Sequence, residues 1–204
     1  KEYDVIHFHF PYPFADLLYL FSFVNKPTLM TYHSDIVRQK ILKHVYFFLQ
    51  EWFLRKMDGI VCTSPQYLKT SRTLQRYKHK TSVIPLGLDD VGISIGPNHY
   101  KNKYKSLLKN PFFLFIGSFR DYKGLDILIS ASKEVDSQFI FVGDGDKKSA
   151  LVEQVKEQGK KNITFVGTVQ NEEKFWLIER CLALVLPSNK RSEAFGLVQI
   201  EALM

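Results

Sequence analysis

The sequence predicts an α/β protein with parallel sheets. Short apolar runs typical of strands alternate with longer amphipathic stretches typical of helices, which is the pattern of βαβ units. The alternation stops at residues 88–111, where Gly, Pro, Asn and Lys dominate, and then resumes. We therefore expect two Rossmann-like domains, at residues 1–95 and 111–204, joined by a linker at residues 96–110.

In the first half, each expected strand is a short run of apolar, β-branched or aromatic residues close to Pro, Gly, Asn or Asp. The predicted strands lie at residues 4–10, 28–32, 59–63 and 82–85. The longer stretches between them predict helices at residues 14–23, 36–56 and 65–77, the last of which begins after Ser64-Pro65.

The second half opens with an apolar strand at residues 112–116 and repeats the alternation. Further strands are expected at residues 139–142, 163–166 and 182–186, and helices at residues 124–133, 148–158 and 174–181. A last helix has Gly196 in its first turn. Parallel sheets of this kind bind ligands beyond the carboxyl ends of their strands, so the site is expected there.

The composition is that of a globular protein, with 45% hydrophobic and 24% charged residues. No apolar run approaches about 18 residues and the first residues do not form a signal peptide, so we expect a cytoplasmic protein without a membrane-spanning helix. Cys62 and Cys181 lie in apolar runs and are expected to be buried thiols.

The net charge of +7 is unevenly distributed, because residues 1–110 hold 16 Lys/Arg and 8 Asp/Glu, while residues 111–204 hold 12 and 13. A basic half attracts an anionic partner. No helix-turn-helix, zinc-finger spacing or RNP-type aromatic motif accompanies the charge, so nucleic acid is not expected and an anionic lipid surface is favoured.

Residues 40–57 combine a wide apolar face with the cations Lys40, Lys43, Arg55 and Lys56. A helix lying on a membrane surface has this pattern, and so has a core helix of a βαβ unit with solvated ends. Both interpretations stay open. The first predicts peripheral association with the inner face of the plasma membrane.

The last thirteen residues, SEAFGLVQIEALM, place Glu193 and Glu201 eight positions apart around a predicted helix start. A helix N-terminus has unpaired N–H groups and a partial positive charge, so it attracts anions. Eight residues of helix span about 12 Å, so two flanking carboxylates would hold hydroxyls on both sides of a bound diphosphate. A nucleotide sugar has this shape. Two solvated helix glutamates would give the same pattern.

This segment resembles the Glu-seven-residues-Glu motif of the family 4 retaining glycosyltransferases, which have the GT-B fold. Blocks similar to those of the family occur in the family's order along the chain: DVIHFHFPYP, TYHSD, IPLGLD, FIGSFRDYKGLDILISA, FVGDG and ITFVGTV. The resemblance covers nearly the whole chain. It implies two partial Rossmann-like domains facing a cleft, and a chain truncated at both ends relative to the family.

The resemblance implies a hexosyltransferase that uses a nucleotide sugar. Glu193 would hold the hexose and act in catalysis, and Glu201 would hold the ribose hydroxyls. The diphosphate would meet the backbone of Ala194, Phe195, Gly196 and Leu197. TYHSDIVRQK and TSP are most similar to mannosyltransferases of surface-polysaccharide assembly, which favours GDP-mannose over UDP-sugars and implies a glycan or lipid-linked acceptor.

Two cations follow a glycine turn in FIGSFRDYKG, residues 115–124. Gly117 would let the backbone approach a diphosphate, and Arg120 and Lys123 could bind it. Ser118 stands where the family usually has Arg, while Lys123 keeps the family's position, so Lys123 is favoured. A cation and a helix terminus stabilise the leaving phosphate, so no metal cofactor is expected.

The FVGDGD segment is expected to form a turn, with Gly143, Asp144 and Gly145 lining the donor cleft. Asp144 and Asp146 could instead form an Asp-x-Asp metal site. A Gly-x-Gly without a third glycine is weak support for dinucleotide binding. By resemblance, Val169 lies where the family's backbone meets the nucleobase.

His33 follows the predicted strand at residues 28–32, and the family's histidine in this block faces the donor hexose across the cleft. We therefore expect His33 to be catalytic, and Asp35 to cap the next helix. His7 and His9 alternate along one strand and would point the same way. No third ligand lies nearby in the sequence, so zinc is not expected. The resemblance implies that this strand end borders the acceptor.

Two other functions stay open. One is a nucleotide-binding module without catalysis, which truncation would produce. The other is an NAD-dependent oxidoreductase, which is disfavoured because no acidic residue follows a full glycine fingerprint at the spacing that a ribose contact needs.

Overall fold

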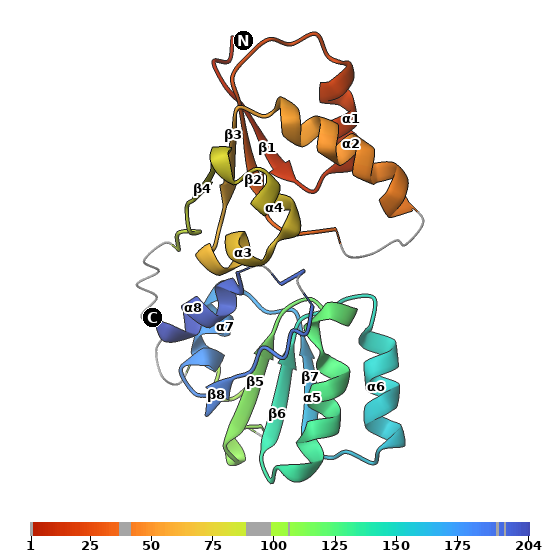
Figure 1. The fold of residues 1–204 in the computed structure, drawn as a ribbon. Helices are drawn as coiled ribbons and strands as arrows, with labels where there is room; N and C mark the ends of the chain where they lie inside the picture. Colours follow the sequence, from red (N-terminus) through yellow and green to blue (C-terminus); the bar gives the residue numbers. More distant parts are fainter. Residues whose placement is uncertain (1, 37–41, 89–98, 106, 191, 194) are drawn as a thin grey trace. The chain divides into compact units, whose positions relative to one another are not determined.

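The computed structural model describes residues 2–204 except 37–41, 89–98, 106, 191 and 194. The chain divides into two compact units, Lys1–Gly87 and Leu88–Met204 (Figure 1). Each unit is an α/β domain with a parallel sheet, as the alternation of strands and helices predicts. We call them unit 1 and unit 2.

Among its described residues, unit 1 contains a four-stranded parallel sheet in the order β1-β2-β3-β4. The strands are β1 (Ile6–Phe10), β2 (Thr28–Tyr32), β3 (Gly59–Cys62) and β4 (Thr81–Val83). The helices are α1 (Pro13–Phe21), α2 (Leu42–Lys56), α3 (Pro65–Thr70) and α4 (Arg72–Arg76), followed by a 3-10 turn at Lys78–Lys80. The start predicted for the second helix falls outside the described residues.

The core of unit 1 follows from the alternation of side chains along β2 and β3. Met30 and Tyr32 on β2 and Ile60 and Cys62 on β3 are at most 1% exposed. Phe10 at the end of β1 is equally buried and stacks on Tyr32, with ring centroids 4.7 Å apart. Burial of these large side chains on a parallel sheet is the main stabilising contribution that we assign to this unit.

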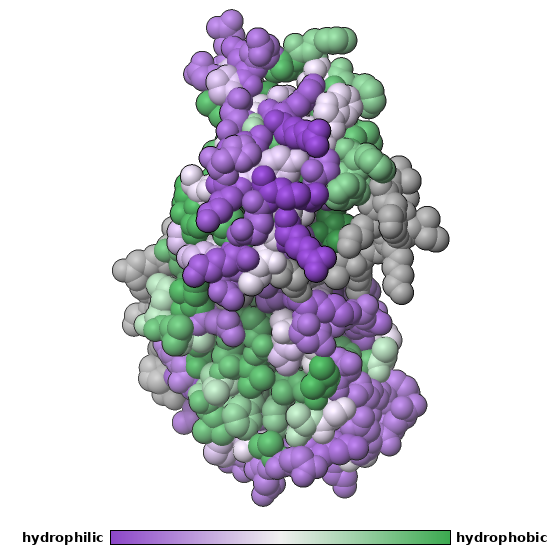
Figure 2. Space-filling model, viewed as in Figure 1, coloured by the Kyte–Doolittle hydropathy of each residue, from purple (hydrophilic) through white to green (hydrophobic). Residues whose placement is uncertain are grey.

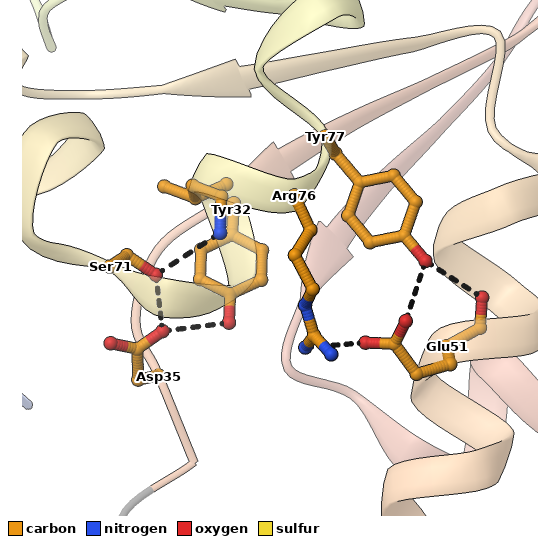
Figure 3. Close-up of polar contacts among 7 residues, drawn as sticks. Tyr32, Asp35, Glu51, Ser71, Arg76 and Tyr77 are labelled. Atoms are coloured by element: carbon orange, nitrogen blue, oxygen red, sulfur yellow. Dashed lines mark hydrogen bonds and ion pairs between the residues drawn. The ribbon is translucent and has the colours of Figure 1, made fainter.

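The single helix predicted at residues 65–77 is wrong, because the structure divides it at Ser71 into α3 and α4. Ser71 has extended backbone angles, and its Oγ accepts a hydrogen bond from the Leu74 N–H at 3.3 Å, so it caps α4. The same hydroxyl donates to Asp35 Oδ1 at 2.8 Å (Figure 3). A contact 36 residues away along the chain therefore stabilises the break.

Unit 2 contains, among its described residues, a four-stranded parallel sheet in the order β7-β6-β5-β8. Its strands are β5 (Phe112–Ile116), β6 (Gln138–Val142), β7 (Ile163–Gly167) and β8 (Ala183–Leu184). Its helices are α5 (Leu125–Ala131), α6 (Lys148–Glu157), α7 (Asn171–Ile178) and α8 (Leu197–Leu203). Short 3-10 turns occur at Leu107–Lys109, Asp121–Lys123 and Ser132–Glu134.

Two hydrophobic clusters cover the two faces of the sheet in unit 2. Phe115 and Phe141 belong to one cluster, while Leu114 and Ile140 belong to the other, as expected for alternating side chains. Tyr104 is 2% exposed and belongs to the second cluster with Trp176. Tyr104, in the linker predicted at residues 96–110, therefore packs in the core of unit 2, while its neighbours Lys103 and Lys105 are exposed.

Candidate functional site

Glycines form the carboxyl edge of the sheet in unit 2. Gly117 follows β5 and donates its N–H to Val142 O at 3.0 Å, and Gly143 follows β6 and donates to Gly167 O at 2.8 Å. Gly143 has φ +136, and a Cβ on it would lie only 2.0 Å from Gly117 O. The backbone of two strand ends thus meets where no side chain fits, which requires glycine.

The turn after Gly143 holds the loop after β5. The Phe119 N–H donates to Asp144 O at 2.9 Å, and the Lys147 N–H donates to Phe119 O at 3.1 Å. A Cβ on Gly145 would lie 2.6 Å from Phe119 O. Gly143, Asp144 and Gly145 therefore form a tight turn against the loop that leads to Lys123.

Lys123 lies beside this glycine edge with its side chain only 10% exposed. It ends the 3-10 turn Asp121–Lys123, and a Cβ built on Gly117 would lie 3.6 Å from Lys123 Nζ. The ammonium forms an ion pair with the carboxylate of Glu193, which is 19% exposed. Ser188 Oγ donates to the same Glu193 oxygen, Oε2, at 3.0 Å. We call Lys123, Ser188 and Glu193 the lysine–glutamate cluster.

Glu201 has a different cation. It lies within α8, and its Oε1 pairs with Lys174 Nζ of α7 at 2.8 Å, with both side chains less than one-fifth exposed. Glu193 lies in the loop before α8 and pairs with Lys123. The two glutamates are therefore not solvated helix residues, which was the alternative explanation of their spacing.

The start of α8 differs in detail from the prediction. Gly196 is the N-cap residue with φ +72, not part of the first turn, and the helix begins at Leu197. Phe195 is half-buried, and Leu197 is 38% exposed. Ala194 lies outside the described residues.

Arg120 does not join the lysine–glutamate cluster. Its exposed side chain lines a cavity of about 260 Å³ together with Lys147 and Lys190. Ser118, where the family usually has Arg, is exposed. Lys123 is therefore the cation that the structure brings to Glu193.

Asp144 has close polar neighbours. Its Oδ2 pairs with Lys148 Nζ at 2.6 Å, and its Oδ1 accepts the Gly145 N–H at 2.7 Å. The Lys148 ammonium and the Gly145 amide lower the pKa of this carboxyl. Within the described residues, no group of three His, Cys, Asp or Glu side chains is arranged to hold a metal ion. Val169 is half-buried against the cluster that contains Trp176.

In unit 1, three histidines gather at β1 and β2. His33 follows β2, and its ring Nε2 lies 2.8 Å from His9 Nδ1. The His7 ring centroid is 4.7 Å from that of His9, and His7 Nε2 is in hydrogen-bond contact with Thr31 Oγ1 at 2.8 Å. Burial lowers the pKa of His33, and the neighbouring His9 and His7 lower it further. His7 and His9 point the same way, as predicted.

Sequence reasoning missed the contact between His9 and His33. The two residues are 24 positions apart, and only the pairing of β1 with β2, in which His9 is opposite Thr31, brings them together. The sequence does carry a signal for this contact, because each histidine stands at or just beyond the end of a predicted strand, and parallel strands end at the same edge.

Asp35 anchors the segment after His33. Its Oδ1 accepts hydrogen bonds from Tyr32 Oη at 2.9 Å and from Ser71 Oγ at 2.8 Å (Figure 3). Burial and the Asp35 carboxylate raise the pKa of Tyr32. The helix start that Asp35 was predicted to cap lies outside the described residues.

Helices α1 and α2 leave several large apolar side chains exposed. Phe21 is 72%, Phe48 75% and Trp52 45% exposed, and the rings of Phe21 and Trp52 lie 6.5 Å apart. Figure 2 shows hydrophobic side chains over these two helices. Arg55 and Lys56 are exposed at the end of α2. Of the helices described, none has the length and apolarity needed to cross a membrane.

Two family models match the chain in succession. Residues 98–204 match the model described as glycosyl transferases group 1, and residues 1–91 match the model described as glycosyltransferase family 4. Together the two matches cover both units.

Two curated relatives are similar over nearly the full chain. The chain is 40% identical to O-antigen chain mannosyltransferase C of Escherichia coli, over 98% of this chain and 54% of the relative. It is 41% identical to D-rhamnosyltransferase WbpZ of Pseudomonas aeruginosa, over 100% of this chain and 53% of the relative. The chain thus spans about half the length of these relatives.

Solved structures share the fold. Sucrose-phosphate synthase from Thermosynechococcus elongatus superimposes with a TM-score of 0.81 at 24% identity, over 98% of this chain and 54% of that structure. Anabaena HepE in complex with UDP-glucose gives a TM-score of 0.76 at 22% identity, over 98% and 57%. The predicted GT-B fold class is confirmed.

Proposed function

Because the chain belongs to the group 1 glycosyl transferases of glycosyltransferase family 4, we propose that it carries the donor site of a retaining hexosyltransferase. The enzyme would transfer a hexose from a nucleotide sugar to a glycan or lipid-linked acceptor. The observation that carries the proposal is the lysine–glutamate cluster, a buried cation and a carboxylate beside a glycine edge.

The cluster offers both kinds of contact that a nucleotide sugar needs. A carboxylate accepts hydrogen bonds from sugar hydroxyls, so Glu193 would hold the hexose. An ammonium has three N–H donors, so Lys123 can keep its contact with Glu193 and also bind a diphosphate oxygen. Glu201, held by Lys174, would accept hydrogen bonds from the ribose hydroxyls through its second oxygen.

The chemistry requires stabilisation of a leaving diphosphate. As the glycosidic bond breaks, negative charge grows on the phosphate, and a buried cation stabilises that charge more than it would in water. Lys123 and the amides of Ala194, Phe195, Gly196 and Leu197 would supply this stabilisation without a metal ion. Arg120 is a weaker candidate, because its side chain lines a different cavity.

Other donor contacts are proposed from the glycine edge. Gly117, Ser118, Gly143, Asp144 and Gly145 would border the donor, and Val169 the nucleobase. The tight backbone packing at Gly143 supports a rigid edge there. In unit 1, His33 would contact the hexose as a catalytic residue. Burial lowers its pKa, which favours a neutral imidazole that can accept or donate a hydrogen bond.

Mannose is the favoured sugar. One relative is named a mannosyltransferase and the other a D-rhamnosyltransferase, and D-rhamnose is 6-deoxymannose, so both names point to a donor with the manno configuration. GDP-mannose is therefore our first choice of donor, and UDP-glucose, which is bound in the HepE structure, is the alternative.

Of the two acceptor classes, glycan and lipid-linked, the lipid-linked one would bring the enzyme to a membrane. The exposed apolar side chains of α1 and α2, next to Arg55 and Lys56, support weak peripheral association with anionic lipid at the cytoplasmic face. Flotation with anionic liposomes should recover the protein at low salt, and about 0.5 M salt should release it. Equal recovery with neutral liposomes, or no recovery with either kind, would contradict this localisation.

The direct test is turnover in excess EDTA. The complete product of the gene is incubated with GDP-mannose or UDP-glucose, and release of the nucleoside diphosphate is measured. We expect turnover with GDP-mannose to persist in EDTA. Activity that is lost in EDTA and restored by manganese would favour an Asp144/Asp146 metal site. Nucleotide binding without turnover would favour the non-catalytic module, and oxidation with a nicotinamide cofactor would favour the oxidoreductase.

A further inference from the structure

We propose that His9 is a positioning residue for His33. Its imidazole binds Nε2 of His33, which couples the tautomers of the two rings, and it leaves Nδ1 as the nitrogen through which His33 meets a ligand. This inference deepens the proposed function, in which His33 contacts the donor hexose, and its first test is independent of that function.

The backbone brings the two rings together. Residue His9 lies opposite Thr31 in the parallel pairing of β1 and β2, and the His33 N–H donates to Phe10 O at 3.0 Å. The backbone of His33 is therefore tied to the end of β1. From there its Nε2 reaches His9 Nδ1 at 2.8 Å, an ordinary hydrogen-bond length. The ring centroids lie 5.1 Å apart, close to the largest separation that a 2.8 Å contact between ring nitrogens allows, and the ring planes differ by only 10°. The contact therefore lies nearly within both rings.

The number of protons on the two rings then limits which nitrogen of His33 can bind a ligand. A neutral imidazole has one donor and one acceptor nitrogen, so a hydrogen bond between two neutral rings needs one proton in the contact. Either the His33 Nε2–H donates to His9 Nδ1, or the His9 Nδ1–H donates to His33 Nε2. In both cases Nε2 of His33 is occupied, and rotation of its ring would break the bond. His33 Nδ1 is the nitrogen left for a ligand.

His7 lies beside His9 on the same strand, and both side chains are exposed. The His7 ring centroid lies 4.7 Å from that of His9, and His7 is itself in hydrogen-bond contact with the Thr31 hydroxyl at 2.8 Å. His7 forms its hydrogen bond with Thr31 and not with His33, although it lies on the same strand. This makes His7 a matched control for the contact between His9 and His33.

The first test is NMR of the 204-residue chain with ¹⁵N-labelled histidine. The wild type should give a nitrogen–nitrogen coupling across the hydrogen bond between His9 and His33, and matching tautomers for the two rings, protonated either both at Nε2 or both at Nδ1. His9→Phe should remove this partner and shift the ¹⁵N resonance of His33 Nε2, whereas His9→Asn, whose amide occupies the place of Nδ1, should restore the wild-type resonance. His7→Phe should leave the ¹⁵N resonances of His33 unchanged. Absence of the coupling in the wild type, or an unchanged Nε2 resonance of His33 in a folded His9→Phe variant, would overturn the proposal.

The second test is kinetic and uses the complete product of the gene. His9→Phe should lower kcat about 10-fold with little change in the KM of the sugar nucleotide, because orientation of a catalytic group is lost while binding is kept. His9→Asn should restore kcat, and the exposed His79→Phe serves as an unchanged control. If kcat of His9→Phe equals that of the wild type, the positioning role is wrong. If His33→Ala is fully active, the catalytic role of His33 fails, while the NMR result stands separately.

Discussion

The two units share an architecture but place different chemistry at the carboxyl ends of their strands. Unit 1 places imidazoles and a hydroxyl there, in side-chain hydrogen-bond contacts such as that between His9 and His33. Unit 2 places glycines there, next to the largely buried ion pair of Lys123 and Glu193. The same kind of sheet can thus present either hydrogen-bonded imidazoles or a fixed pair of charges. The second arrangement suits a charged ligand such as a nucleoside diphosphate.

The largest expected effect is a loss of stability that differs between a glycine of unit 2 and a glycine of unit 1. Gly143→Ala in unit 2 should destabilise the protein by about 3 kcal/mol, because its Cβ would lie 2.0 Å from Gly117 O at a positive φ. Gly59→Ala in unit 1 should stay within about 1 kcal/mol of the wild type, because the Leu29 side chain 3.1 Å away can move. Chemical denaturation measures both. Similar losses for the two variants would show that the glycine edge of unit 2 is not tightly packed.

The next largest effect concerns the two glutamates of unit 2. Glu201→Ala should weaken binding of free GDP by about 1.5–3 kcal/mol, because a charge-assisted contact with the ribose is lost. Glu193→Ala should spare free GDP and lower turnover of GDP-mannose, because the hexose is present only in the complete donor. Titration calorimetry and turnover assays measure these effects.

An exposed carboxylate provides the control for both variants. Glu157 lies at the end of α6 and is exposed, so Glu157→Ala should change neither GDP binding nor turnover. If Glu193→Ala and Glu201→Ala have equal and small effects, neither glutamate binds the donor as proposed.

A smaller effect concerns the buried carboxyl of Asp16 in unit 1. Its hydrogen-bond partner is a hydroxyl, whereas the Glu193 carboxylate of unit 2 pairs with the Lys123 ammonium. Asp16 is 1% exposed and accepts a hydrogen bond from the neutral Tyr46 hydroxyl. Burial raises the pKa of Asp16 from 3.8 to about 6, although the Tyr46 hydrogen bond opposes this shift. The raised pKa means that the folded state favours the protonated form. The stabilisation that Asp16 contributes to the folded state is complete below the pKa that Asp16 has in the unfolded chain. It is lost as the pH rises through the pKa that Asp16 has in the folded protein.

The unfolding free energy should therefore fall between about pH 4 and pH 6 and level off above that range. A shift of about two pKa units corresponds to at most about 3 kcal/mol, and solvent screening reduces the expected fall to about 1–2 kcal/mol. Denaturation at several pH values measures it, and Asp16→Asn should remove most of the fall. A wild type whose stability rises over this range would contradict the assignment.

The strands could be predicted from the sequence because burial on a parallel sheet requires apolar runs such as Phe112–Ile116. Other features depend on contacts between distant residues. The break at Ser71 uses a serine N-cap, which is a local signal, but its second support is Asp35, 36 positions away, which no local pattern reveals. The ion pair of Lys123 and Glu193 joins residues 70 positions apart. For these, the sequence indicates which residues are candidates, and the fold determines their partners.

The central claim is that the charges of unit 2 bind a nucleoside diphosphate without a metal ion. Titration of GDP into the 204-residue chain in excess EDTA, followed by calorimetry, tests it most directly. We predict saturable binding that Glu201→Ala weakens and Glu157→Ala leaves unchanged. Absence of binding, or binding that appears only after manganese is added, would contradict the claim.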